Sequence, residues 1–195
     1  CLAYLLQKQR DAVGVSFFDT KVGFQSQVKS TSAHLRMLFA EFENLLAKSE
    51  QAINKKSNVS EALHVLAETI HKRSLIVIFS DMMDNSEQQD QLFNSLQHLK
   101  HNKNEVLLFH VYDRQTELEL DFENRPVEFI DIETAEKIKL MPQDVHEAFK
   151  AKVLENARQV MLRCVQLKID YVRADIQEGV EKVLESYLVK RSKML

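Results

Sequence analysis

The chain has 195 residues, of which 45% are hydrophobic, which is enough for one α/β domain with a sizeable core. Its 26 basic and 29 acidic residues give a net charge of -3, and this balance argues against nucleic acid or an anionic membrane as a partner. Two cysteines make no disulfide framework and no apolar stretch approaches the roughly 18 residues that span a bilayer, so we expect a single cytoplasmic domain over residues 1–195.

The first elements in chain order are short. Residues 2–9 are predicted to be the end of a helix, and because Cys1 lies inside the amphipathic pattern without a capping residue, we expect the helix to begin upstream in a longer natural protein. Residues 12–19 and 22–28 are predicted to form a hairpin whose second strand lies at a sheet edge. Apolar residues at spacings of three and four predict two helices, over residues 32–48 and 59–70.

The segment from Leu75 to Phe79 is apolar at every position and is followed by Ser80 and Asp81. A strand of this kind needs cover on both faces, as in a parallel sheet between helices. A helix pattern around Leu92 and Leu96 leads to a second such strand over residues 105–112. The order strand, helix, strand predicts a right-handed crossover and a parallel sheet.

Residues 118–141 change to an alternating pattern, which predicts an inserted β-hairpin with its turn at residues 133–136. Pro142 is suited to the first turn of a helix, and the apolar spacing continues this helix to about Leu167. A strand over residues 170–176 and a helix over 180–190 complete the chain. The fold class predicted is α/β.

Asp81 is the main candidate for function, because parallel sheets bind ligands at the carboxyl ends of their strands. Its oxygens suit a hard cation, although a solvated strand end or a helix cap would also explain an aspartate here. Only three glycines occur and no two are close, which excludes the P-loop and the dinucleotide fingerprint. The histidines form no zinc motif and are expected at the surface, whereas Cys164 lies on an apolar helix face and is expected in the core.

Three segments resemble a bacterial protein family, the domain of unknown function numbered fifty-eight: residues 11–19, 73–81 and 105–113. Residues 129–134 and 169–172 are also similar, so the resemblance covers nearly the whole chain. The core of this family is like the von Willebrand factor A domain. The resemblance therefore implies a three-layer, Rossmann-like sheet that is mostly parallel, with one antiparallel edge strand.

The resemblance also implies a metal-ion-dependent adhesion site, built from an Asp-x-Ser-x-Ser loop, a Thr and an Asp. Asp81 matches the Asp, and Ser57 matches the position of the Thr, although Ser57 is also a good N-cap for the helix that follows. The loop does not occur in this sequence, and the resemblance places it with its strand upstream of Cys1. We therefore expect Mg²⁺ or Mn²⁺ in the complete protein, and weak metal binding or none by residues 1–195 alone.

These observations predict a protein-interaction module and not an enzyme. An acidic side chain of the partner protein would complete the coordination of the cation, and the resemblance implies a MoxR-type AAA+ ATPase as companion, with this chain as adaptor. One alternative is a Mg²⁺-dependent hydrolase in which Asp84 or Asp19 supports Asp81. Another is a scaffold whose metal site is vestigial.

Overall fold

The computed structural model describes residues 1–18, 22–48, 63, 66–82, 86–120, 127–130 and 137–192. By their contacts the residues divide into two compact units. The first comprises Cys1–Ala62 and Ile130–Glu136, and the second comprises Leu63–Phe129 and Lys137–Leu195. A single domain over the whole chain stays a prediction.

The first unit contains α1 (Leu2–Lys8), β1 (Ser16–Phe18), β2 (Val22–Gln25) and α2 (Ser32–Lys48). β1 and β2 pair antiparallel, as predicted, and form a two-stranded sheet of their own. The ring of Phe17 lies 5.5 Å from that of Phe24 and 5.2 Å from that of Phe42, so aromatic packing holds the strands to α2. β1 is shorter than predicted: before Ser16 the N–H of Val15 donates to the hydroxyl of Ser26 at 2.8 Å, and Val13 pairs with Lys29 only as an isolated bridge.

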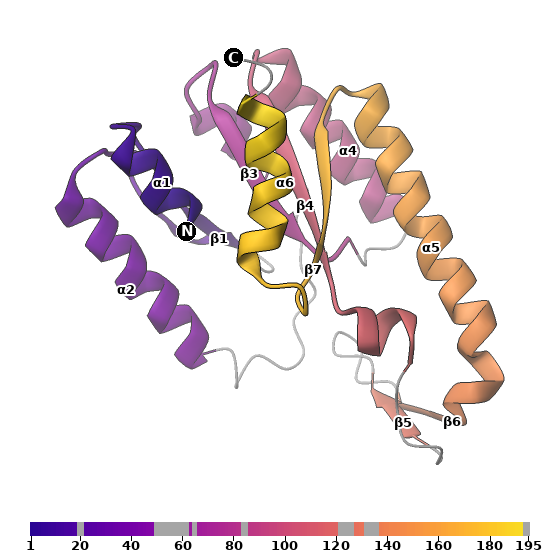
Figure 1. Cartoon of the computed structure of the whole chain (residues 1–195). Coiled ribbons are helices and arrows are strands. Elements are labelled where there is room, and N and C mark those ends of the chain that lie inside the picture. The colour runs from indigo at the N-terminus through magenta and orange to yellow at the C-terminus, as the bar shows by residue number, and fades with distance from the viewer. Residues whose placement is uncertain are drawn as a thin grey trace. The chain divides into compact units, whose positions relative to one another are not determined.

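The second unit is built on a parallel sheet, as the apolar runs predicted (Figure 1). Its strands are β3 (Leu75–Ser80), β4 (Glu105–Tyr112) and β7 (Asp170–Asp175), and β4 lies between the other two. β4 is buried from Val106 to His110, whereas Phe79 of β3 is 56% exposed. The Phe79 ring stacks on that of Phe109 at 4.8 Å.

Helices cover both faces of this sheet: α4 (Ser86–His101), α5 (Pro142–Gln166) and α6 (Val180–Ser192) (Figure 1). The strand register puts Leu108 beside Tyr171, on the face opposite Phe109. Phe109 packs against Tyr187 of α6, whereas Tyr171 lies near Cys164 of α5. The unit is thus an α/β arrangement of three layers, compatible with a Rossmann-like fold.

Two further elements follow β4. The π-helical turn η2 (Arg114–Leu118) was not predicted, and β5 (Val127–Ile130) and β6 (Lys137–Leu140) form a two-stranded sheet. The predicted turn at residues 133–136 lies outside the described residues, as does most of the helix predicted over 59–70. Within the described ranges, no helix has the length and apolar content needed to cross a membrane.

The core position of Cys164 makes a prediction about thiol reactivity. Its side chain is fully buried and burial raises its pKa to about 12, while Cys1 is exposed. Since the thiolate is the nucleophile, a thiol reagent at about pH 8 should label Cys1 quickly and leave Cys164 intact until denaturant is added. Mass spectrometry of labelled peptides measures this, and equal labelling of both thiols in the native protein would contradict the assigned core.

Candidate functional site

Acidic side chains gather where the strands of the parallel sheet end. Asp81 follows β3, Asp113 follows β4 and Asp175 is the last residue of β7, and Glu117 comes from η2 just beyond β4. Burial raises the pKa of Glu117, and the charges of Asp81, Asp113 and Asp175 raise it further. The hydrogen bond from the N–H of Asp113 lowers this pKa but does not cancel the rise. Glu117 therefore lies within electrostatic range of the other three carboxylates, at the edge where parallel sheets bind ligands.

Asp113 and Glu117 cap the π-helical turn reciprocally. The carboxylate of Asp113 accepts the N–H of Gln115 at 3.0 Å, and Glu117 accepts the N–H of Asp113, also at 3.0 Å. The pKa of Asp113 is lowered: desolvation opposes this shift, but hydrogen bonds from Gln177, Gln115 and Thr116 outweigh it. Both carboxylates thus act as capping residues, because they accept the backbone N–H groups at the start of the turn.

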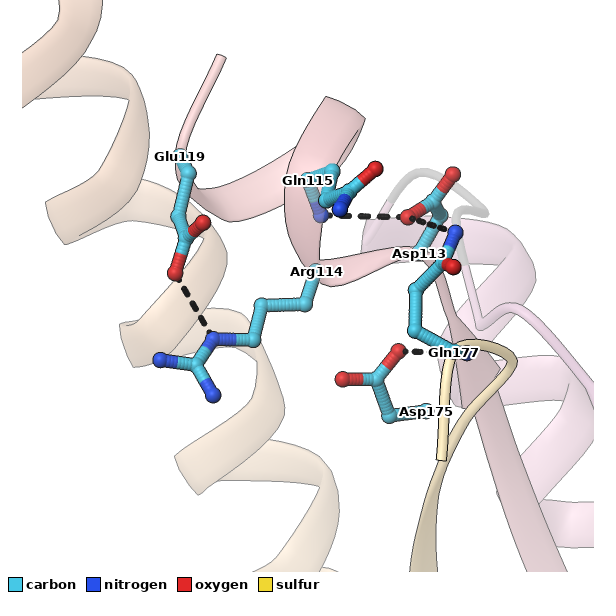
Figure 2. A network of polar contacts seen from close by, with 6 residues as sticks. All are labelled: Asp113, Arg114, Gln115, Glu119, Asp175 and Gln177. Atoms are coloured by element: carbon cyan, nitrogen blue, oxygen red, sulfur yellow. Dashed lines mark hydrogen bonds and ion pairs between the residues drawn. The ribbon is translucent and has the colours of Figure 1, made fainter. Parts of the chain in front are cut away.

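The end of β7 is tied to the end of β4 (Figure 2). Asp175, which is 5% exposed, accepts the backbone N–H of Gln177 at 3.0 Å, and the side-chain amide of Gln177 donates to Asp113 at 3.3 Å. Figure 2 also shows Arg114 reaching Glu119, with an Nε–Oε1 distance of 2.7 Å. This hydrogen bond raises the pKa of Arg114. The network holds the two strand ends together and offsets part of the negative charge.

Asp81 differs from these neighbours because its side chain is exposed. Its backbone lies in a turn that is held by hydrogen bonds of the residues on either side. Ser80 Oγ accepts the N–H of Met82 at 3.2 Å. Nδ1 of His110 in β4 lies 2.7 Å from the hydroxyl of Tyr171 in β7, and the backbone of Asp81 is close enough to His110 to raise the pKa of its ring, against the larger effect of burial. The end of β3, where Ser80 pairs with His110, therefore lies beside a contact that joins the other two strands.

The expectation that the histidines lie at the surface is wrong for His110 and His34, which are 6% and 8% exposed. His110 belongs to the central strand, where helices cover both faces, and burial is the main reason that its pKa is lowered. A neutral imidazole can accept the hydroxyl of Tyr171 at Nδ1 while its other nitrogen carries the proton.

Of the predicted metal ligands, Asp81 lies exposed at the carboxyl edge, where it was expected. Ser57 lies outside the described residues, as do Asp84 and Asp19, so the approach of Ser57 to Asp81 stays a prediction. Within the part of the chain that is described, no three His, Cys, Asp or Glu side chains are arranged to hold a metal ion. The described residues alone do not fit a complete cation site.

Sequence reasoning missed Asp113, Asp175 and Glu117. A signal for the first two was present, because each stands at or next to the end of a predicted strand, as Asp81 does. Glu117 could not be found in this way, since it reaches the edge through a π-helical turn that the pattern does not indicate.

The raised pKa of Glu117 predicts how stability depends on pH. A carboxyl whose pKa in the folded state exceeds its ordinary value of 4.5 destabilises the fold when it ionises. This destabilisation is absent below pH 4.5 and complete above the pKa of the folded state. Glu117→Gln keeps the acceptor for Asp113, so it should stabilise the protein at about pH 7, by under about 1 kcal/mol at this half-buried site, and not at about pH 4.

Thermal unfolding at both pH values, with Glu181→Gln on exposed α6 surface as control, measures this effect. The gain should shrink in about 0.5 M salt, because salt screens the neighbouring carboxylates. An equal gain in stability of Glu117→Gln at both pH values would show that the ionised form of Glu117 is not destabilised by the neighbouring carboxylates.

Comparisons with known proteins bear on the family of this chain. The family model described as "Protein of unknown function DUF58" matches residues 1–159. No curated protein matches the chain, and no solved structure does. The matched range includes β3, β4 and η2, whereas β7 and α6 follow it. Because the match covers more than half of the sequence, the chain belongs to the family of proteins of unknown function DUF58.

Proposed function

We propose that this chain is a protein-interaction module whose contact surface is the carboxyl edge of the β3-β4-β7 sheet. The observation that supports this proposal best is the contrast between Asp81 and its neighbours. The Asp81 side chain is exposed, whereas Asp175 is buried and Asp113 and Glu117 are half-buried, and the backbone turn that carries Asp81 is bound by Ser80. An anionic group held in this way is suited to binding at the surface.

In this proposal Asp81 supplies one oxygen ligand to Mg²⁺ or Mn²⁺, Ser57 supplies a second, and an acidic side chain of the partner protein occupies an open position. Hard cations take carboxylate and hydroxyl oxygens and keep several waters. The nearby carboxylates favour a cation here, since clustered charge of one sign attracts the opposite sign. The remaining ligands come from outside the described residues, because those described do not complete a site.

The wider fold and the partner belong to the same proposal. The three-layer sheet is proposed to be that of a von Willebrand factor A-like domain, with an antiparallel edge strand and a hairpin inserted at residues 118–141. The partner proposed is a MoxR-type AAA+ ATPase, with this chain as its adaptor in the cytoplasm. Both come from the resemblance of the three segments at residues 11–19, 73–81 and 105–113.

The two alternative functions require different metal ligands at this edge of the sheet. A Mg²⁺-dependent hydrolase needs a further carboxylate beside Asp81 to bind the metal, and the two candidates for this role, Asp84 and Asp19, lie outside the described residues. A scaffold with a vestigial metal site needs no cation at all, and its binding would be insensitive to a chelator. We favour the interaction module because it asks for one exposed ligand, Asp81.

Cation binding can be tested by NMR even where affinity is low, because Mn²⁺ broadens the signals of nuclei close to it. Addition of Mn²⁺ should broaden the amide signals of residues 80–82, and Asp81→Asn should abolish this, since it removes the anionic oxygen. Ser57→Ala should weaken it. Asp144→Asn, at an exposed aspartate in the first turn of α5, is the matched control. Unchanged broadening in Asp81→Asn would reject Asp81 as a ligand.

Partner binding is tested with a purified MoxR-type ATPase. The chain should retain the ATPase in Mg²⁺, and both EDTA and Asp81→Asn should reduce binding by about tenfold or more, because the cation bridges two anionic groups. Binding that resists the chelator would favour the scaffold. Hydrolysis of a phosphate ester that is lost in Asp81→Asn would favour the hydrolase instead.

A further inference from the structure

Met82, the residue after Asp81, has an unusual backbone for its side chain. Its φ is +53°, in the left-handed region that non-glycine residues seldom adopt, and its side chain is fully buried. Such a conformation persists only where the surroundings hold it in place. The contacts of Met82 therefore bear directly on how Asp81 is presented.

Two side chains from different helices hold the carbonyl of Met82. The amide of Gln89 in α4 donates to it at 3.3 Å, and the amide of Asn156 in α5 donates to it at 3.3 Å. Gln89 also donates to Asn156 Oδ1 at 2.9 Å, so the two amides are joined to each other. The N–H of Met82 is bound by Ser80, which leaves both backbone polar groups of this residue occupied.

We propose that Gln89 and Asn156 are positioning residues for Asp81, a role that rests on the proposed function of this edge. The pair holds the left-handed turn, and that turn determines where the Asp81 carboxylate lies relative to the strand ends. Groups that orient a metal ligand in this way typically change metal affinity by about 10- to 100-fold when they are removed.

The test removes the two donors while keeping side-chain size: Asn156→Leu and Gln89→Met. Gln159→Leu is the control for an exposed amide on the same helix, and Val160→Ala is the control for lower stability, because Val160 is fully buried in α5. Amide hydrogen exchange at Met82, relative to that at Leu108 in β4, reports on the turn. The Mn²⁺ concentration that half-broadens residues 80–82 reports on the ligand.

In Asn156→Leu and Gln89→Met we expect exchange at Met82 to rise about tenfold relative to Leu108, and about 10- to 100-fold more Mn²⁺ to be needed. Val160→Ala should lower the melting temperature and change neither quantity. A Met82 exchange ratio equal to that of Gln159→Leu would overturn the proposal, as would faster exchange with an unchanged Mn²⁺ requirement. If the wild-type chain shows no broadening, the cation proposal itself fails, and the exchange ratio alone decides whether the pair holds the turn.

Discussion

Parallel hydrogen bonding between β3, β4 and β7 is the constraint on which the other features of the second unit depend. Six residues of β3 pair in register with β4, from Leu75 opposite Glu105 to Ser80 opposite His110. β7 pairs with β4 from Leu107 onward. Because all three strands run the same way, their carboxyl ends meet at one edge, and each ends at or just before an aspartate. The same register puts apolar residues of β4 against helices on both faces, which excludes water from the strand between them.

Gathering carboxylates at one edge has an electrostatic cost, and the chain offsets it with local hydrogen bonds. Asp113, Glu117 and Asp175 each accept a backbone N–H. Arg114 lies within electrostatic range of Asp175, whose negative charge helps to raise the pKa of Arg114. These contacts stabilise three of the charges without a cation. Asp81 is the exposed member of the set, which is why the proposed recognition rests on it.

The exposed carboxylate depends on a buried frame. Met82 turns the chain away from β3 in a left-handed conformation, with its side chain in the core and its carbonyl between Gln89 and Asn156. The frame connects α4, α5 and the end of β3, so the packing of two helices acts on one surface side chain. A rigid support of this kind lowers the entropy that a surface group loses on binding.

Local patterns in the sequence predicted most elements, because apolar periodicity depends on neighbours along the chain. α2, β3, β4, α5 and β7 lie within one or two residues of their predicted ranges, and Asp81 was found because it ends an apolar run. The pattern did not reveal the burial of His110, the turn η2, or the Gln89–Asn156 pair. Gln89 lies 67 residues from Asn156, and Asn156 lies 74 residues from Met82, so only folding brings them within hydrogen-bonding distance. The sequence by itself thus determined the strands and the aspartate that follows one of them, whereas the tertiary structure decided which distant side chains hold the turn after that aspartate, because hydrogen bonds depend on proximity in space.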